Sequence, residues 1–422
     1  MTNLIHKSAL NKIIIVAALG YFVDIYDLVL FGMERVSSLT EILTPTISDE
    51  VERGKLVKTI GIALLNWQMF GMLLGGIFWG ILGDKKGRLS VLFGSIFLYS
   101  IANIANAFVH DTTTYAVMRF ISGFGLAGEL GAGITLVSES MSKEKRGYGA
   151  TIVASVGLFG AVVAGTVGIA IGNWRISYII GGVMGLLLLL MRIGILESGM
   201  FKQVKESAVE KGNFLSLFKS KQRFTKFITI ILVALPVWFV MGILITFCPE
   251  IMKSLGMQNP PKNARLALTL AYVGITIGDV VSGLLSQKWQ SRKKSLLLFL
   301  ILTVIFTISY FTIAKNSEVL FYTVIILIGF ATGYWAVFIS TASELFGTNL
   351  RATVTTTVPN FVRGGTILIT TLFQFFASYN SIGNIYSAIM VGLIVFALGF
   401  WAWYKLEETF NKDLNYIEEK IN

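Results

Sequence analysis

The stretch GYFVDIYDLVLFG, residues Gly20 to Gly32, places two carboxylates inside the first long apolar run of the chain. Asp24 and Asp27 are three residues apart, so they lie on one face of a helix. An ionised carboxylate at membrane depth costs several kcal/mol unless it faces water, a partner or a proton. We therefore expect a functional helix that crosses a membrane. The alternative is a helix end with solvated acids, and the further turn of apolar sequence beyond them argues against it.

Composition indicates a polytopic membrane protein. Of the 422 residues, 54% are hydrophobic and 14% are charged, whereas soluble globular proteins carry about 25% charged residues. The net charge of +11 is spread over short loops with no basic domain, which argues against a nucleic-acid partner. The single cysteine, Cys248, excludes an internal disulfide and leaves no metal or redox motif. We therefore expect no cofactor and no metal.

Twelve apolar runs are each about 20 residues long, which is the length of a helix that crosses a bilayer. The longest break between them is a polar stretch rich in Lys and Glu. We expect an all-α membrane protein with an N-terminal six-helix bundle (1–196), a cytoplasmic linker (197–226) and a C-terminal six-helix bundle with a short cytoplasmic tail (227–422). The predicted spans are residues 12–33, 60–82, 89–109, 114–137, 149–171, 174–195, 227–249, 266–286, 295–314, 319–342, 353–377 and 383–404.

The loop charges predict the orientation. If the N-terminus is cytoplasmic, the inner segments hold 23 of the 35 Lys and Arg residues and the outer segments hold nine. Because cytoplasmic loops carry the excess of Lys and Arg, we predict that both termini lie on the cytoplasmic side of the inner membrane.

The two predicted halves repeat each other. Three glycines of the second span recur in the eighth span 203 positions later, and three residues of the fourth span and its inner loop recur 205 positions later. Six helices separate the copies, so the halves share one topology and form a parallel repeat. The first set is Gly71, Gly75 and Gly80 with Gly274, Gly278 and Gly283, and the second is Gly128, Glu139 and Arg146 with Gly333, Glu344 and Arg351.

The inner loop GILGDKKGRL, from Gly80 to Leu89, resembles the signature loop of the major facilitator superfamily. The matching residues are Gly80, Leu82, Asp84, Gly87 and Arg88. The second-half copy departs from the pattern, because Gln287 replaces the acid and Arg292 comes one residue late. With twelve spans in two halves, the resemblance extends over the whole chain and implies the fold of that family.

The fourth span opens with RFISGFGLAGELG, from Arg119 to Gly131, which resembles the motif of sugar porters and metabolite:proton symporters. The resemblance implies that Asp27 and Arg119 form a proton-coupling pair. At 1.5 Å per residue, both lie about 22 Å from the inner face, so their depths permit it. The resemblance also implies a cytoplasmic charge network that controls opening. Its residues are Asp84, Arg88, Glu139, Arg146, Glu197, Glu344 and Arg351.

Four further charges within the spans have two interpretations each. Asp24 is a proton site or a substrate contact, although we favour Asp27 as the carboxylate paired with Arg119. Glu129 is a second proton or substrate group, or the partner of an inner-loop cation. Arg363 holds a substrate carboxylate, or it forms an intramembrane pair with Asp279.

Four aromatic residues lie on spans whose counterparts line the central cavity in this superfamily. A buried Trp or Tyr normally needs a hydrogen-bond partner, which a substrate can supply. Packing against helices or lipid is the alternative. The four candidates for substrate contact are Tyr26, Trp238, Tyr334 and Trp335.

These features predict a proton-coupled secondary transporter, not an enzyme, that works as a monomer by alternating access. The expected substrate is a small anionic or zwitterionic metabolite, with organic acids, amino acids, phosphate and sugars all open. A phosphate-binding loop of the GxxxxGK[ST] type is not in the sequence, which argues against an ATP-driven pump. Proton-coupled efflux is a rival, disfavoured by the lack of Pro in GLFGAVVAGTVG (157–168). Another rival function is that of a receptor that resembles a transporter but transports no solute.

Overall fold

The computed structural model describes residues 2–86, 88–131, 133, 137, 141, 146–196, 214–347, 350–379 and 383–412. Every element in these residues is a helix. The N-terminal half contains α1 (Thr2–Leu43), α2 (Glu50–Lys86), α3 (Arg88–Asn106), α4 (Thr112–Leu126), α6 (Arg146–Ile171) and α7 (Trp174–Leu196). The C-terminal half contains α8 (Lys221–Phe239), η3 (Val240–Ile245), α9 (Cys248–Ser254), α10 (Arg265–Lys288), α11 (Arg292–Thr312), α12 (Glu318–Thr332), α13 (Trp335–Leu345), α14 (Arg351–Ala377) and α15 (Gly383–Lys405).

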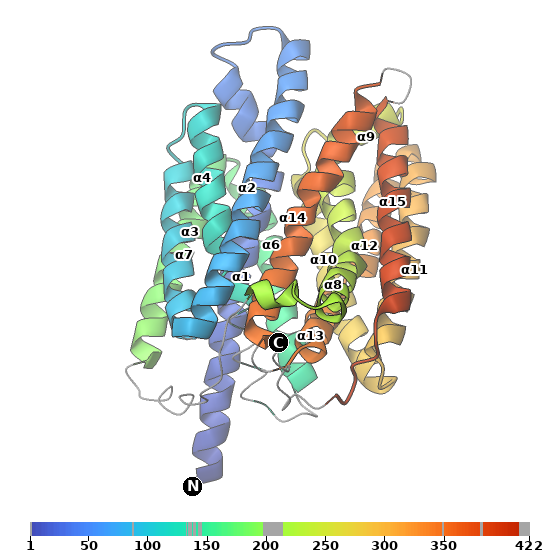
Figure 1. Cartoon of the computed structure of the whole chain (residues 1–422). Helices are drawn as coiled ribbons and strands as arrows, with labels where there is room; N and C mark the ends of the chain where they lie inside the picture. Colours follow the sequence, from blue (N-terminus) through green and yellow to red (C-terminus); the bar gives the residue numbers. More distant parts are fainter. Residues whose placement is uncertain are drawn as a thin grey trace.

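The predicted all-α fold of twelve membrane-spanning segments is confirmed. Most predicted spans coincide with one helix, but α8 with η3 forms the seventh span, α12 with α13 forms the tenth, and α4 covers the fourth only as far as Leu126. The helices α1 and α2 are much longer than predicted and extend past the others at one end of the molecule (Figure 1). The charged residues that follow the first apolar run therefore belong to a helix and not to a loop.

The two halves stand side by side, with α1 to α7 on one side and α8 to α15 on the other (Figure 1). The amino end of α1 and the carboxyl end of α15 lie at the same end of the molecule. We call this the inner end, following the orientation that the loop charges predict, and the opposite one the outer end.

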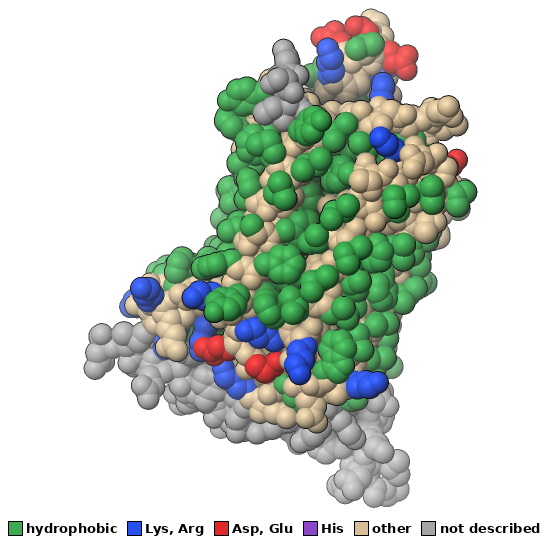
Figure 2. All heavy atoms as spheres, turned by 90° about the vertical axis from the view of Figure 1, so that its right-hand side faces the viewer, with side chains coloured by type: hydrophobic (Ala, Val, Ile, Leu, Met, Phe, Trp, Pro, Cys, Tyr) green, Lys and Arg blue, Asp and Glu red, His purple; other side chains and the backbone are tan. Residues whose placement is uncertain are grey.

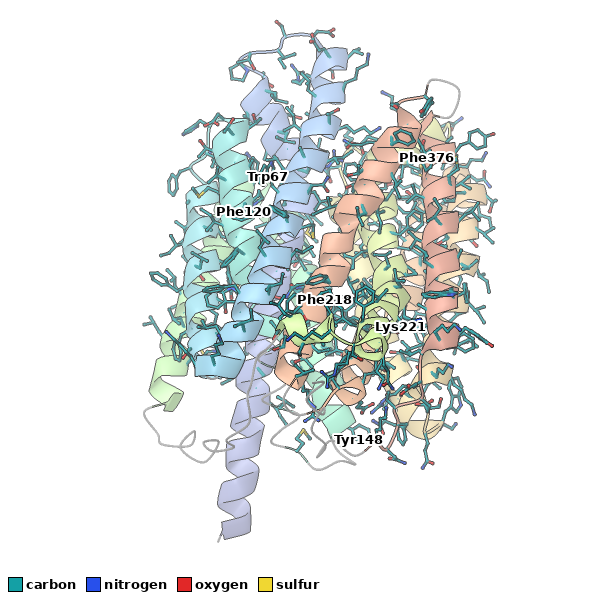
Figure 3. All side chains as sticks on the ribbon, viewed as in Figure 1. Trp67, Phe120, Tyr148, Phe218, Lys221 and Phe376 are labelled. Carbon is teal, nitrogen blue, oxygen red and sulfur yellow. The ribbon has the colours of Figure 1, made fainter. Side chains whose placement is uncertain are left out.

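A band of apolar side chains surrounds the helices between charged rims, as Figure 2 shows for the face that carries α11 and α15. Ile305, Leu393 and Trp401 are 48%, 67% and 48% exposed in this part of the chain. On α2 and α4, Trp67 and Phe120 make an edge-on contact at 6.1 Å near the surface (Figure 3). Apolar exposure on this scale marks an interaction surface, and here it fits lipid.

The repeated glycines serve the same helix contact in each half. A Cβ at Gly71 or Gly75 of α2 would lie 2.2 or 2.3 Å from a carbonyl oxygen of α4. A Cβ at Gly274 or Gly278 of α10 would lie 2.2 or 2.1 Å from a carbonyl oxygen of α12. Small residues let helix backbones approach this closely. The third pair of the repeat, Gly80 and Gly283, faces the opposite half instead.

Candidate functional site

The halves meet along two helix pairs, α2 with α14 and α6 with α10. Thr370 of α14 donates a hydrogen bond to Asn66 of α2 over 2.7 Å. Towards the inner end, the amide of Asn360 donates to the carbonyl oxygen of Ala127 at 2.8 Å. A Cβ at Gly283 of α10 would lie 2.6 Å from the hydroxyl of Thr151 on α6. The contacts of Asn360 and Gly283 close the inner side of the interface, whereas the Thr370 contact lies nearer its outer side, because α14 runs from the inner to the outer end.

Two ion pairs close the outer side. Arg35 of α1 pairs with Glu250 of α9 at 2.8 Å, and its neighbour Glu34 pairs with Arg265 of α10. The Glu34 and Arg35 side chains are fully buried. Arg35 also donates to the carbonyl oxygen of Thr246 at 3.2 Å. Breaking one partner of a buried ion pair is strongly destabilising because it leaves an uncompensated charge, so these pairs hold the two halves together.

Sequence reasoning missed this outer contact. Glu34 and Arg35 fell just beyond the predicted first span, and their partners were assigned to outer loops. The available signal was the sequence GMERV, in which an acid and a base follow an apolar run and an apolar residue comes directly after them.

A narrow cavity, within about 350 Å³ of non-atom space that includes open solvent, lies between the inner and outer contacts. Its walls come from both halves. They are formed by Tyr21, Ile25 and Leu28 of α1, Leu158 of α6, Val237 and Trp238 of α8, Met241 of η3, Tyr272 and Ile275 of α10, Thr332 of α12, Trp335 of α13 and Arg363 of α14. A second space of about 340 Å³ shares four of these residues and continues towards Thr246 and the outer ion pairs.

Several buried polar atoms at the cavity have no hydrogen-bond partner in the described structure. They are both carboxylate oxygens of Asp24, the hydroxyl of Tyr21, the indole nitrogen of Trp335 and the Nε of Arg363. Arg363 supplies the principal opposite charge at Asp24, and its guanidinium lies 5.8 Å from the Trp335 ring centre. Because buried polar groups are normally satisfied, these atoms mark a candidate position for a polar ligand.

Asp27 lies deeper in the N-terminal half. Arg119 is the principal opposite charge at its carboxylate, as the resemblance implies. Arg119 donates to Asn103 at 2.8 Å, and Asn103 in turn lies beside Asp27. No ion pair joins Asp27 and Arg119 directly, although both side chains are described. Gly181 of α7 provides the space, because a Cβ there would lie 2.1 Å from Asp27 Oδ1.

The two carboxylates point in different directions around the axis of α1. At about 100° per residue, the cavity-lining residues Tyr21, Ile25 and Leu28 centre on one direction. Asp24 lies about 60° from that direction and Asp27 about 120° from it. Asp24 therefore lies beside the cavity-lining face of α1 without being a lining residue itself, whereas Asp27 faces α4 and α7.

Glu129 is paired within the membrane. It accepts hydrogen bonds from Arg192 of α7, one of them at 3.1 Å, and the two side chains are 1% and 4% exposed. The cation beside Glu129 is thus a residue of the sixth span and not one of the inner loops. Arg192 also donates to the carbonyl oxygens of Val16 and Leu92, so the pair links α7 and the fourth span with α1 and α3.

The expected pair between Asp279 and Arg363 is not formed, although both side chains are described. Asp279 instead accepts a hydrogen bond at 2.7 Å from the backbone nitrogen of Ala336. The tenth span breaks at Gly333 and Tyr334, and α13 starts afresh at Trp335. The free amides at a helix start attract a carboxylate, which explains the different partner.

The four predicted aromatic residues divide into two pairs. Trp238 and Trp335 line the cavity. Tyr26 and Tyr334 do not, because their hydroxyls donate to the carbonyl oxygens of Ser177 at 3.2 Å and Val233 at 3.1 Å.

Two tyrosines of the cavity wall, Tyr21 and Tyr272, were missed. Tyr21 lies three residues before Asp24, so helical spacing could have identified it.

The inner charge network is described only in part. Glu139 and Glu197 lie outside the described residues, as do the side chains of Asp84, Arg88 and Arg146. In the C-terminal half, Arg292 donates to both oxygens of Glu344 at 3.2 and 3.0 Å. Arg351 donates to the carbonyl oxygen of Ser343. The altered second-half motif therefore still supplies an arginine that pairs with an acid.

A cavity between two similar helix bundles, with contacts between the bundles on either side of it, is the architecture of a secondary transporter. The family model of the major facilitator superfamily matches residues 17–358. The chain therefore belongs to the major facilitator superfamily and is a transporter, not an enzyme.

Individual comparisons agree with this assignment. The chain is 26% identical to a protein of Haemophilus influenzae named for metabolite transport, over 86% of this chain and 88% of that one. It is 29% identical to the 3-(3-hydroxy-phenyl)propionate transporter of Escherichia coli, over 55% and 57% of the two chains. A solved structure of the proton:xylose symporter XylE has a TM-score of 0.74 at 18% identity and covers 97% of this chain and 98% of that one.

Proposed function

We propose that this transporter imports a small monocarboxylate with a flat apolar body, together with a proton. One observation carries the proposal: among the described side chains, Arg363 is the principal opposite charge at Asp24 without forming an ion pair with it, beside a cavity walled by Trp238, Trp335 and Tyr21. A guanidinium can bind a carboxylate through two parallel hydrogen bonds. Aromatic side chains contribute large apolar contact area to a planar body.

Charge balance supplies the coupling. In the empty cavity the charge of Asp24 balances that of Arg363. When a substrate carboxylate binds Arg363, two negative charges share one positive charge. At a separation of about 5 Å and an effective dielectric constant near 20, the repulsion is about 3 kcal/mol. Protonation of Asp24 removes it, so one proton accompanies each carboxylate. Asp27 beside Arg119 is the alternative proton carrier.

The outer ion pairs give the cycle its outer gate. Release of Arg35 from Glu250 and of Glu34 from Arg265 opens a path from the outside through the second space to the cavity. Reclosing these pairs, followed by separation of the inner contacts, releases substrate and proton into the cytoplasm. We place the protein in the inner membrane with both termini cytoplasmic, acting as a monomer.

The chemistry of the cavity favours a ring-bearing acid over a sugar or phosphate. Its wall holds one cation and mostly apolar or aromatic side chains. A sugar needs many directional hydrogen bonds, and a phosphate carries more charge than Arg363 can balance. The substrate in the name of the Escherichia coli relative, 3-(3-hydroxy-phenyl)propionate, supports an aromatic carboxylate.

Thermal unfolding of the purified protein with candidate ligands tests the substrate class. We expect an aromatic monocarboxylate to stabilise it more than an aliphatic monocarboxylate, an amino acid, xylose or inorganic phosphate. The best ligand is then supplied to proteoliposomes under an inward proton gradient, with a protonophore as control. Stabilisation by xylose or phosphate alone would overturn the substrate class. Accumulation that survives the protonophore would overturn the coupling.

A further inference from the structure

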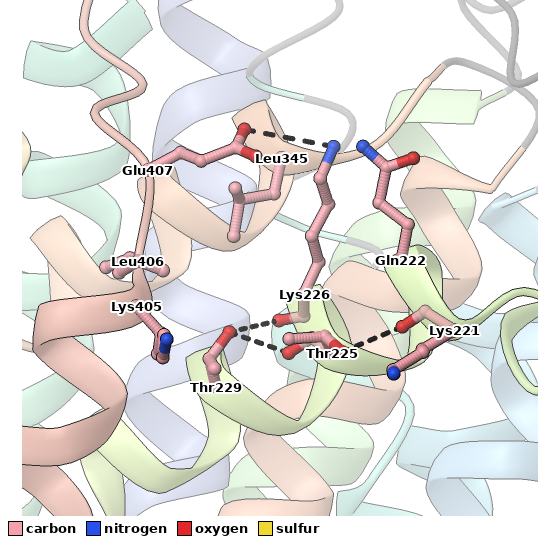
Figure 4. Close-up of a pocket in the computed structure, with 9 residues that line it drawn as sticks. All are labelled: Lys221, Gln222, Thr225, Lys226, Thr229, Leu345, Lys405, Leu406 and Glu407. Carbon is pink, nitrogen blue, oxygen red and sulfur yellow. Dashed lines mark hydrogen bonds and ion pairs between the residues drawn. The ribbon is translucent and has the colours of Figure 1, made fainter.

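A basic pocket opens at the inner end of the C-terminal half, away from the central cavity (Figure 4). It lies between the first turns of α8 and the segment that follows α15, beside Leu345 at the end of α13, and contains about 750 Å³ of open space. Three lysines and one acid line it. They are Lys221, Lys226, Lys405 and Glu407.

The charges of this pocket do not cancel. Lys226 reaches Glu407 at 3.9 Å, and Lys412 reaches the same carboxylate at 3.1 Å. Burial raises the pKa of Glu407, but the hydrogen bond from Lys412 and the charges of Lys226 and Lys412 outweigh it, so the pKa is below its usual value. Glu407 is therefore ionised at neutral pH, and its single charge is divided between two lysines.

The amino groups of Lys221 and Lys405 are available to bind an anion from outside the protein. No acidic side chain of the described chain pairs with either of them. In Figure 4 their amino groups lie away from the Lys226–Glu407 pair, on opposite sides of Thr225 and Thr229. Both threonine hydroxyls donate to carbonyl oxygens within α8, at 2.8 Å each. The lysines, with the amide of Gln222, are therefore the donors that this pocket offers to a ligand.

The pocket lies at the level of a membrane surface. Leu215 and Phe218, just before α8, are 68% and 47% exposed, and Trp401 and Tyr404 at the end of α15 are 48% and 68% exposed. Figure 3 shows Phe218 and Lys221 together near the inner end of the helices. Exposed Trp and Tyr concentrate at the headgroup level of a bilayer. An anion that reaches Lys221 and Lys405 therefore meets apolar surface directly next to them.

We propose that this pocket binds the phosphate headgroup of an anionic phospholipid of the inner leaflet, with its acyl chains against the neighbouring helices α8 and α15. Lysine is a common phosphate ligand and acts as a point charge. Basic pockets between membrane helices on the cytoplasmic side bind such headgroups. Every lining residue belongs to the C-terminal half, so the lipid binds one half and leaves the interface between the halves free.

Lipid binding to the full-length protein in detergent tests the proposal by native mass spectrometry and thermal unfolding. The probes are phosphatidylglycerol, phosphatidylcholine, inorganic phosphate and glycerol phosphate. We expect phosphatidylglycerol to bind and stabilise the protein more than phosphatidylcholine. Lys221→Gln with Lys405→Gln should weaken that binding about fivefold per lysine, from about 1 kcal/mol for each charge near an anionic surface.

Two further variants serve as controls. Lys288→Gln with Lys294→Gln removes two exposed lysines of the same end outside the pocket and should leave lipid binding unchanged. Lys221→Arg with Lys405→Arg keeps the charges and should bind as the wild type does, which separates a charge effect from a folding defect. Full lipid binding by the Gln pocket variant would overturn the site. Equal stabilisation by inorganic phosphate or glycerol phosphate would overturn the lipid as its ligand.

Discussion

Asp24 and Asp27 are three residues apart, and the structure gives them different surroundings. Asp24 lies beside the cavity-lining face of α1, and Arg363 of the opposite half is its principal opposite charge. Asp27 lies inside the N-terminal half beside Arg119 and Asn103. A proton on Asp24 is therefore directly sensitive to substrate at Arg363, whereas a proton on Asp27 is sensitive to the packing of α1 against α4 and α7.

Neutralising each carboxylate separates these roles. Asp24→Asn should abolish accumulation driven by a proton gradient while substrate exchange across the membrane continues. The neutral amide replaces the protonated carboxylate, so a substrate carboxylate can bind Arg363 without the uptake of a proton. Asp27→Asn should retain at least part of the gradient-driven accumulation. Uptake and counterflow in proteoliposomes measure both. The opposite result, with Asp24→Asn fully coupled and Asp27→Asn uncoupled, would move the proton to Asp27.

Arg363 should bind the substrate carboxylate through its planar fork. Arg363→Lys keeps the charge but not the two parallel donors, so substrate affinity should fall about tenfold to a hundredfold, or about 1.4–2.8 kcal/mol. Isothermal calorimetry measures it. Arg192→Lys is the matched control: it alters the buried pair with Glu129 and should lower thermal stability without changing affinity. An unchanged affinity in Arg363→Lys would refute the assignment.

At the scale of single residues, sequence reasoning identified the charged side chains that fall within apolar membrane spans. Asp24, Asp27, Arg119 and Arg363 were all found in this way, and all four are buried. It failed for Tyr26 and Tyr334, because the direction of an aromatic side chain depends on helix rotation and on carbonyl oxygens in other helices. No local pattern encodes these partners.

The internal repeat of the sequence corresponds to a helix contact that is made once in each half. The equal spacing of glycines in the second and eighth spans reflects one contact, made once between α2 and α4 and once between α10 and α12. The spacing predicted the repeat because close backbone contact tolerates no other side chain. The lengths of α1 and α2 were not predicted, because the charges that extend them resemble loop charges unless their partners are known.

A methyl group at these contacts should destabilise both halves similarly. Gly75→Ala and Gly278→Ala place a Cβ 2.3 and 2.1 Å from a backbone carbonyl oxygen, and we expect each to cost about 1–3 kcal/mol as an overpacking substitution. Thermal unfolding in detergent measures the loss. Gly54→Ala is the control, because nothing lies within 4 Å of its added Cβ. Equal stability of all three variants would contradict the packing described.

The two halves meet through residues that are far apart in the sequence. Arg35 and Glu250 are separated by about half of the chain, and Asn66 and Thr370 by 304 positions. Two six-helix bundles could be predicted from hydropathy and repeats. Which faces of the bundles meet could not, because both halves carry apolar faces towards lipid as well as towards each other.

Cys248 reports the opening of the outer gate. It is fully buried, two residues before Glu250. Replacement of Arg35 by Gln leaves Glu250 without its buried partner and should make the outer side open more often. Alkylation of Cys248 by a membrane-impermeant maleimide from outside should then be faster than in the wild type. Cys248→Ser controls for labelling elsewhere. Equal labelling rates in Arg35→Gln and the wild type would show that this pair does not control outer access.

Proton movement during substrate entry tests the central claim most directly. Proteoliposomes loaded with a pH-sensitive dye receive the stabilising carboxylate with no preset gradient, and internal acidification is compared with radiolabelled uptake. The account predicts one proton per carboxylate in the wild type and none in Asp24→Asn. Substrate entry into wild-type proteoliposomes without internal acidification would contradict it.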